Sequence, residues 1–289
     1  MSLNQVLDRP ISQTLPYVEA ELTYLVPMAE KLVNYTYEPP AGILRSNGTY
    51  QAHKLPIYNA RSIAKDISLD KEGFGFTQHQ TQVHNFYDEE ELRRVYYLEA
   101  EQLLKEVTGA EQVVIFDHTL RNATQSKANE NSIKEPVKRV HNDFTAKSGY
   151  TRARLELATR GIDNIDELLQ RRFAIINVWR AIAHAQPIQE SPLAVCDAQS
   201  IAPTDLVAGD LVYRGRVGET YAVTYNQEHK WFYFPQMHRD EALFIKCFDS
   251  ATDGRARFAA HTAFEDPTSP SDAPPRESIE LRTLVFYPD

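Results

Sequence analysis

The sequence predicts a mainly β protein, an antiparallel sandwich or barrel accompanied by a few helices. From residue 172 onward, short runs rich in β-branched and aromatic residues follow one another at even spacing, with turn residues between them. One clear helix stands near residue 90, and no linker is long enough to separate two domains. We therefore expect a single domain over residues 1–289, in which an α/β segment at 1–110 wraps around a β core at 111–289.

The N-terminal segment is predicted to contain two strands, at 18–27 and 49–61, and a helix within 86–110. Asp88 is a good N-cap, Glu91 stands where it completes a capping box, and Gly109 stands where a C-terminal cap belongs. The helix carries an apolar stripe, which predicts one buried face. Its members are Leu92, Val95, Tyr96, Leu103 and Val107.

A buried strand at 111–119 follows this helix, and short helices are predicted at 151–161 and 164–172. The expected β-rich runs then cover 172–182, 192–198, 210–215, 219–225, 230–235 and 242–250. A final strand at 277–287 closes the chain, after a loop rich in Pro and Ser at 265–275.

Composition limits the kind of partner that the protein can have. The 31 basic and 40 acidic residues give a net charge of -9, which argues against nucleic acid or an anionic membrane. No apolar stretch approaches the roughly 20 residues of a membrane span, and the start lacks the layout of a signal peptide. Cys196 and Cys247 form neither a metal-type spacing nor a disulfide framework. We expect a cytoplasmic protein whose main partner is neither nucleic acid nor a membrane; a small-molecule substrate is implied only by the family resemblance described below.

The motif His141-Asn-Asp143 follows an apolar alternating run and is a candidate metal site. On an extended chain, residues two apart point to the same face, so the imidazole and the carboxylate would lie side by side. A mononuclear iron site for oxygen chemistry uses two His and one carboxylate. His261, after the apolar run 255–260, is the candidate for the third ligand. The same pair is also compatible with a polar strand end that faces water.

If such an enzyme uses 2-oxoglutarate, a basic residue after the third His must hold the far carboxylate of this cosubstrate. Arg suits the task because its planar fork matches a carboxylate. Arg276 is the preferred candidate, and Ser278 could add a hydroxyl donor. Arg276, Ser278, Glu280 and Arg282 share one face of the last strand, so Arg282 remains a rival anchor.

Other histidines compete less well for the metal. His238 and Asp240 form a second His-x-Asp, but Asp240 lies only 21 residues before His261, a short path around a barrel. His118 directly follows an Asp, so the two side chains would point to opposite faces, and we expect His118 to pack or to form a hydrogen bond. His184 and His229 stand among loop residues, and we expect both at the surface.

Several blocks in the right order resemble the CmcJ/AsaB-like family, from about residue 70 to the end. They are residues 73–121, "VHNDFT", "INVWRAI", "SPLAVCDAQS" and residues 261–287. That family is described as non-haem iron, 2-oxoglutarate-dependent hydroxylases and desaturases of secondary metabolism. The resemblance implies a double-stranded β-helix (jelly-roll, cupin-like) core, with Fe(II), 2-oxoglutarate and O2 as cofactor and cosubstrates.

The resemblance also implies roles for individual residues. His141, Asp143 and His261 would be the iron ligands, and Arg276 with Ser278 the cosubstrate anchor. Arg121 in "FDHTLR", and Asn177 and Arg180 in "INVWRAI", fall within matching blocks without an assigned role. Asn177 and Arg180 would point to opposite faces of a strand, so at most one would face the pocket; a buried hydrogen bond and a surface cation are equally compatible with them. After Arg180 the family pattern has a Pro that this chain lacks, which leaves the shape of that loop open.

Two other interpretations remain. One is a cupin-like metal dioxygenase or isomerase that does not use 2-oxoglutarate. The other is a non-catalytic jelly-roll binding protein or partner subunit, whose His and Asp are merely polar. The sequence does not distinguish hydroxylation, desaturation and oxidative cyclisation, and it fixes neither the substrate nor the oligomeric state.

Overall fold

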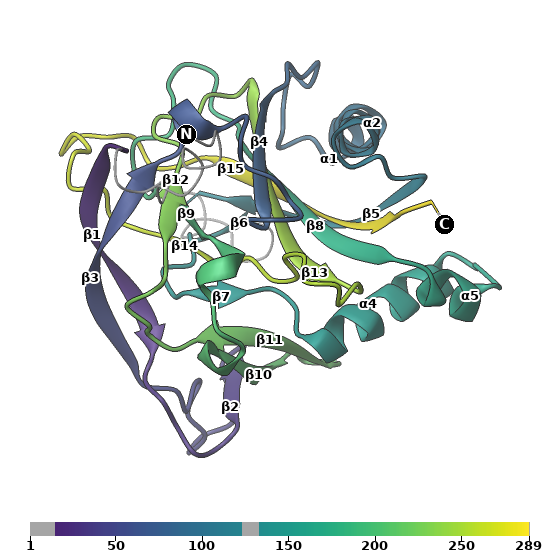
Figure 1. Cartoon of the computed structure of the whole chain (residues 1–289), viewed down its shortest axis with the longest axis horizontal. Coiled ribbons are helices and arrows are strands. Elements are labelled where there is room, and N and C mark those ends of the chain that lie inside the picture. The colour runs from purple at the N-terminus through teal and green to yellow at the C-terminus, as the bar shows by residue number, and fades with distance from the viewer. Residues whose placement is uncertain (1–14, 123–132, 289) are drawn as a thin grey trace, which may run out of the picture.

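The computed structural model describes residues 15–122 and 133–288, and in this part of the chain two β-sheets are accompanied by a few outer helices (Figure 1). The larger sheet has nine strands in the order β1–β3–β12–β9–β14–β7–β11–β10–β2, and the smaller has six in the order β4–β13–β8–β15–β5–β6. Most neighbours are antiparallel, but β2 and β10, β3 and β12, and β5 and β6 pair in parallel. The arrangement is the mainly β, jelly-roll fold that the sequence predicts.

The elements of the described residues have the following bounds. The strands of the larger sheet are β1 (Tyr17–Leu25), β2 (Leu32–Tyr35), β3 (Tyr50–Asn59), β7 (His141–Asn142), β9 (Leu193–Cys196), β10 (Leu206–Val212), β11 (Val217–Val223), β12 (Trp231–Tyr233) and β14 (His261–Ala263). Those of the smaller sheet are β4 (Phe74–Gln78), β5 (Gln112–Arg121), β6 (Ile133–Lys134), β8 (Phe173–Ala181), β13 (Glu241–Asp249) and β15 (Ser278–Phe286). The helices are α1 (Glu89–Glu91), α2 (Tyr97–Thr108), α4 (Ala146–Thr159) and α5 (Ile165–Gln170), with a π-helical turn at Leu92–Tyr96 and 3-10 turns at Arg61–Ile63, Ala198–Ser200 and Pro203–Asp205.

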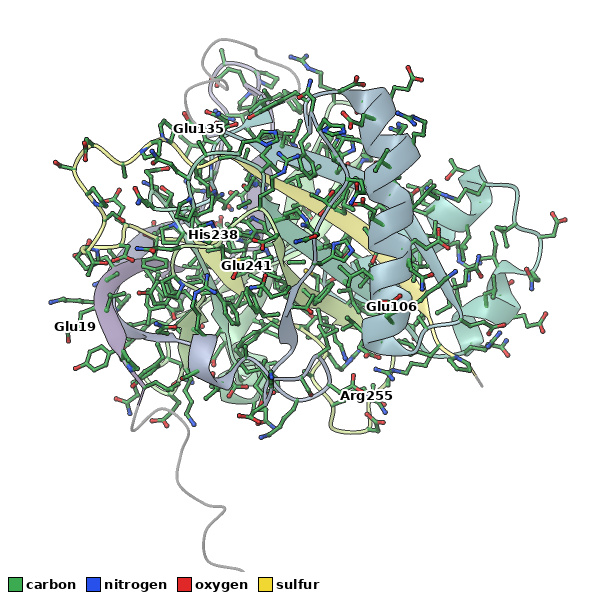
Figure 2. All side chains as sticks on the ribbon, turned by 90° about the horizontal axis from the view of Figure 1, so that it is seen from above. Glu19, Glu106, Glu135, His238, Glu241 and Arg255 are labelled. Atoms are coloured by element: carbon green, nitrogen blue, oxygen red, sulfur yellow. The ribbon has the colours of Figure 1, made fainter. Side chains whose placement is uncertain are left out.

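The helical stretch that starts after Asp88 covers the outer face of the smaller sheet, and Figure 2 shows it lengthwise with Glu106 near one end. Asp88 caps it by accepting from the backbone N–H groups of Glu90 and Glu91, and Gly109 ends it at a φ of 70°. Two details of the sequence prediction are wrong. Glu91 forms no capping box, because its carboxylate accepts the N–H groups of His84 and Asn85 instead. Val107 is 44% exposed, since it lies at the edge of the packed stripe.

Strands β8 and β15 alternate strictly between the two faces of the smaller sheet. Ile176, Val178 and Leu281 belong to the apolar cluster beneath α2, whereas Trp179 and Leu284 belong to the cluster that also contains residues of the larger sheet. The inward positions of β15 are therefore the even-numbered residues from 278 to 286, as the period of two in the sequence predicts.

The larger sheet curls back on itself near its N-terminal strands. Thr23 and Leu25 of β1 form parallel bridges to Arg139 and Thr224, beside β7 and β11. The curl surrounds an apolar cluster that includes Leu22, Tyr24, Ile57, Val140 and Trp231. The N-terminal strands thus complete the larger sheet, and the segment before β7 is held in place.

His229 is not at the surface, contrary to the sequence prediction. It is only 6% exposed, because its loop folds over the curled part of the larger sheet. Its Nε2 lies 3.1 Å from Asp205 Oδ2, and its Nδ1 lies 3.1 Å from the hydroxyl of Tyr24. The two hydrogen bonds explain how a loop histidine tolerates burial.

Candidate metal centre

His141 and His261 meet across two neighbouring strands of the larger sheet. They are directly opposite each other in the β7–β14 register, so their side chains share a face. The two ring centroids are 4.4 Å apart. Residues far apart in the sequence are therefore brought to one point by strand pairing.

Backbone carbonyls fix the tautomer of both rings. His141 Nδ1 lies 2.8 Å from the carbonyl oxygen of Arg139, and His261 Nδ1 lies 3.2 Å from that of Ala259. A carbonyl oxygen can only accept, so each Nδ1 carries the hydrogen and donates it. Both Nε2 lone pairs are then free to bind a cation, which is the arrangement that metal-binding histidines commonly use.

Asp143 completes the cluster on the same side as His141, as the two-residue spacing predicts. Its Oδ1 lies 3.6 Å from His141 Nε2. Its Oδ2 accepts hydrogen bonds from Asn177 Nδ2 at 2.8 Å and from Arg282 Nε at 2.9 Å. One carboxylate oxygen is therefore held by the smaller sheet, and the other is turned towards the two histidines. The ligand atoms of His141, Asp143 and His261 lie within 4.8 Å of one another.

The intervening Asn142 anchors this motif to the protein core. It is fully buried, and its side-chain amide donates to the carbonyl oxygens of Phe144 at 2.6 Å and of Cys247 at 2.8 Å. Thr145 then caps α4 by accepting from the N–H groups of Lys147 and Ser148. The His-x-Asp turn is thus fixed on both sides before any ligand binds.

The electrostatics favour the ligand forms of the cluster at neutral pH. Burial, and after it the nearby His261, lowers the pKa of His141 to about 4, so this ring is neutral. Burial opposes ionisation of Asp143, but the charge of Arg282, with His261 and His141, brings the pKa of this carboxyl well below its usual range. Neutral imidazole and ionised carboxylate are the forms that bind a divalent metal.

Arg282 is fully engaged by neighbouring side chains. Besides Asp143, its guanidinium donates to Glu280 at 2.5 Å and to Thr119 at 3.0 Å. Glu280 and Thr119 hold the guanidinium of Arg282 beside the carboxylate of Asp143, and Arg282 thereby orients that carboxylate. Thr119 was not a candidate from the sequence, because only the register of β5 against β15 places it beside Arg282.

Arg276 and Ser278, in contrast, retain unused hydrogen-bonding groups. Arg276 is 2% exposed, donates from Nη1 to the carbonyl oxygen of Ser191 at 2.6 Å and lies over the ring of Trp179. Within the described residues, Arg276 Nε and Ser278 Oγ are buried and have no hydrogen-bond partner. Burial, and after it the charge of Arg121, lowers the pKa of Arg276 to about 9. A carboxylate would satisfy both orphaned groups, so these residues fit a carboxylate ligand.

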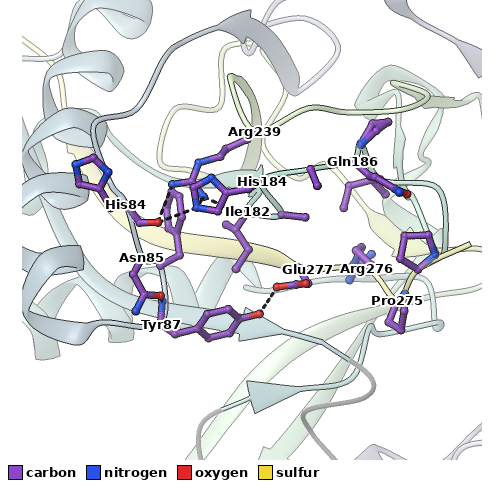
Figure 3. Close-up of a pocket in the computed structure, with 16 residues that line it drawn as sticks. His84, Asn85, Tyr87, Ile182, His184, Gln186, Arg239, Pro275, Arg276 and Glu277 are labelled. Carbon is purple, nitrogen blue, oxygen red and sulfur yellow. Dashed lines mark hydrogen bonds between the residues drawn. The ribbon is translucent and has the colours of Figure 1, made fainter.

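A cavity of about 390 Å³ lies beside Arg276, between the segment before α1 and the loops at 182–188 and 274–277 (Figure 3). Glu277 accepts a hydrogen bond from the hydroxyl of Tyr87 at 2.6 Å on one wall. His184 and Arg239 form the opposite wall. None of the three candidate ligands lines this cavity, but Arg276 does.

The competing histidines lie elsewhere. His238 and Asp240 are exposed at the turn before β13. His118 bonds the hydroxyl of Tyr97 at 2.8 Å, as the prediction of packing or hydrogen bonding requires. His184 is exposed, as expected. Among the described residues, the only group of three potential ligands is the one formed by His141, Asp143 and His261.

Asn177 and Arg180 point to opposite faces of β8, as expected. Asn177 reaches Asp143, whereas Arg180 points outward and bonds the hydroxyl of Tyr96 and the carbonyl oxygens of His79 and Arg239. Arg180 is fully buried beneath the helical segment, which excludes the interpretation as a surface cation. Its contacts make it a structural residue.

Two imidazoles and one carboxylate on one side of a metal are the donor set of mononuclear non-haem iron sites. The set leaves further coordination positions open. Ser278 begins β15 of the facing sheet, and Arg276 lies in the loop just before it. Such an arrangement is suited to bind a metal, an anionic chelating ligand and a third small molecule at once. Redox chemistry on a bound organic molecule is the reaction class that this permits.

Comparison with known proteins agrees with this geometry. A family model described as an oxidoreductase/YMDC permease-like domain matches residues 22–286. The hydroxylase/desaturase efuI of Hormonema carpetanum is 32% identical, over 95% of this chain and 96% of its own length. The Fe(II)/2-oxoglutarate-dependent dioxygenase nvfI of Aspergillus novofumigatus is 31% identical, over 93% of this chain and 97% of its own length. The hydroxylase/desaturase asaB of Aspergillus flavus is 41% identical, over 43% of this chain and 60% of its own length.

A solved structure extends the likeness to three dimensions. The iron and alpha-ketoglutarate-dependent endoperoxidase NvfI superimposes with a TM-score of 0.84 at 29% identity, over 94% of this chain and 99% of the other. The jelly-roll prediction is thereby confirmed. No helix among the described residues is long and apolar enough to cross a membrane.

Proposed function

The chain belongs to the CmcJ/AsaB-like family, and we infer from this membership that it is an Fe(II)/2-oxoglutarate-dependent oxygenase of secondary metabolism that acts on a small molecule. The observation in this chain that carries the inference is the convergence of His141, Asp143 and His261, whose ligand atoms lie within 4.8 Å of one another. The reaction is a hydroxylation, a desaturation or an oxidative cyclisation.

We propose that His141 and His261 hold iron through Nε2, and Asp143 through Oδ1. The fixed tautomers and the hydrogen bonds to Asp143 Oδ2 support this assignment. Arg276 and Ser278 hold the far carboxylate of 2-oxoglutarate. Their orphaned Nε and Oγ support this assignment, and the engagement of Arg282 by Asp143 and Glu280 counts against that residue as the anchor.

Bound iron activates dioxygen, and the oxidative decarboxylation of 2-oxoglutarate to succinate supplies electrons, so that a substrate C–H bond can be broken. The residues of this chain contribute position. Asn177 and Arg282 hold Oδ2 of Asp143 in hydrogen bonds, so that Oδ1 would be the oxygen available to a metal. Arg276 and Ser278 fix the distance of the cosubstrate from the histidines. The placement of the substrate then selects among the three outcomes.

The test is an anaerobic titration of the metal-free protein with Fe(II) and then with 2-oxoglutarate, followed by visible absorption. We expect a weak charge-transfer band that requires both additions and is lost in His141→Ala and Asp143→Ala. His238→Ala removes the exposed histidine of the rival motif and serves as the matched control, with an unchanged band. Iron binding without the band would favour a cupin-like enzyme that does not use 2-oxoglutarate. No iron binding in the wild type would leave only a non-catalytic binding protein.

We further propose that residues 1–289 act as one domain, because β1 and β3 complete the larger sheet and β4 pairs with β13. A cytoplasmic location is also proposed. The buried free thiols of Cys196 and Cys247 and the net charge of -9 support a reducing compartment and a partner that is not nucleic acid.

A further inference from the structure

Arg121 ends strand β5 on the face that looks towards the metal centre. In the β5–β15 register it is directly opposite Ser278, just as Thr119 is opposite Glu280. Directly opposite residues of an antiparallel pair share a face. Arg282 donates hydrogen bonds to both Thr119 and Asp143. The face of the smaller sheet that carries Thr119 is therefore the face that looks towards Asp143. Arg121 therefore stands beside the orphaned hydroxyl of Ser278.

The charge of Arg121 lowers the pKa of two nearby groups, Arg276 and His141. It is the nearby charge with the largest effect on Arg276, whose pKa is lowered first by burial and then by Arg121. Its charge also lowers the pKa of His141, by less than burial and His261 do. The charge of Arg121 thus acts both on the anchor Arg276 and on a histidine of the candidate metal centre.

The guanidinium of Arg121 has spare bonding capacity. Its hydrogen bond to the carbonyl oxygen of Glu135, at 2.8 Å from Nη1, uses one of five possible donors. Within residues 15–122 and 133–288, no carboxylate lies within ion-pair distance of it, whereas its neighbour Arg282 is paired with both Asp143 and Glu280. Burial lowers the pKa of Arg121, and the nearby charges of Glu280 and Asp143 do not fully offset this effect.

Arg282 engages the carboxylates of Asp143, Glu280 and Asp117. Among the described residues, no side-chain carboxylate is paired with the guanidinium of Arg121 or of Arg276. Both lie at the end of the sheet where Ser278 Oγ and Arg276 Nε have no hydrogen-bond partner within the described residues. An anion at that end would compensate two partly or fully buried cations at once.

We propose that Arg121 is a second guanidinium for the far carboxylate of 2-oxoglutarate, which it binds together with Arg276 and Ser278. The proposal rests on the proposed function, since it concerns the same cosubstrate. It assigns a binding role to a residue of the "FDHTLR" block that had none. It also gives a reason for an arginine that ends β5 beside the candidate metal centre and has no anionic partner among residues 15–122 and 133–288.

The test measures 2-oxoglutarate affinity by the charge-transfer band in the Fe(II)-loaded protein, for wild type and Arg121→Met. We expect the variant to bind 2-oxoglutarate roughly 10–100-fold more weakly, the range for loss of a charge-assisted pair. Its affinity for Fe(II), measured separately, should stay within about twofold, as it does for a residue that does not touch the ligands. Arg152→Met is the matched control, because Arg152 is also partly buried but pairs with Glu156 on α4.

A second keto acid locates the contact. 2-Oxobutyrate has the metal-binding end of 2-oxoglutarate but lacks the far carboxylate, so Arg121→Met should bind it like the wild type. Equal losses for both acids would place Arg121 at the metal end and overturn the proposal. Unchanged binding of 2-oxoglutarate, or a parallel loss of Fe(II) affinity, would also overturn it. If Arg121→Met does not fold, Arg121→Gln, which is polar but uncharged, replaces it with the same criteria. Absence of the band in the wild type would instead refute the proposed function.

Discussion

Replacement of Arg282 by Met should weaken metal binding without unfolding the protein. Arg282 Nε donates to Asp143 Oδ2 at 2.9 Å, and within the described part of the chain the only other side-chain donor to that oxygen is Asn177 at 2.8 Å. Arg282→Met keeps an apolar stem of similar length but removes the cation. Asp143 then loses a charge-assisted hydrogen bond, and the pKa of this carboxyl rises because Arg282 is the nearby charge that lowers it most.

The expected size follows from that single contact. A hydrogen bond to a charged group contributes about 1.5–3 kcal/mol, which corresponds to roughly 10–100-fold in an equilibrium constant. Loss of an outer partner of a metal ligand has effects of the same order. Asn177→Leu removes a neutral donor, so a smaller loss, about fivefold, is expected for it.

The assay is a competition titration of Fe(II), or of Co(II) as a stable spectroscopic substitute, against a chelator. The absorption of bound Co(II) also reports a change in coordination, which a purely structural role of Arg282 would not alter. Arg152→Met is the control, because its guanidinium lies over Phe116 and pairs with Glu156. Wild-type metal affinity and spectrum in a folded Arg282→Met protein would refute the reasoning that Arg282 positions Asp143.

Three further predictions concern stability, and each is measured by thermal unfolding of the metal-free protein. Gly149→Ala should lower the free energy of unfolding by about 1–3 kcal/mol, because the added Cβ would lie 2.4 Å from the ring of Phe248. An unchanged unfolding midpoint would show that the ring moves aside. Burial lowers the pKa of His229 below 6.5, so the unfolded state takes up more protons below that pH, and stability should fall as pH drops from 7.5 to 5.5. His229→Asn should show a smaller pH-dependent loss, and an equal loss in both proteins would contradict this assignment. Lys246→Met should lower the free energy of unfolding by about 3–5 kcal/mol, because it removes a fully buried ammonium 2.8 Å from the carboxylate of Asp249. A loss below about 1 kcal/mol would mean that other cations suffice to compensate the charge of Asp249.

Local backbone geometry explains what the sequence alone determined. The period of two placed His141 and Asp143 on one face, and it separated Asn177 from Arg180. It also aligned Ser278 with the inward positions of the last strand. Cap residues located the main helix for the same reason, because a cap depends only on the nearest backbone groups. These patterns need no knowledge of the distant chain.

Only the tertiary structure decided which distant groups meet. Arg276 and Arg282 are an even number of residues apart, so the sequence could not show which of them is the cosubstrate anchor. The hydrogen bond from Arg282 to Asp143, which comes from the facing sheet, distinguishes the two. His229 looked like a loop residue until the curled larger sheet enclosed it. The partner of each such side chain is set by strand register and sheet curvature, which are the outcome of packing the whole core. For that reason, period and spacing gave the candidate ligands of the metal centre, and packing supplied the residues that position them.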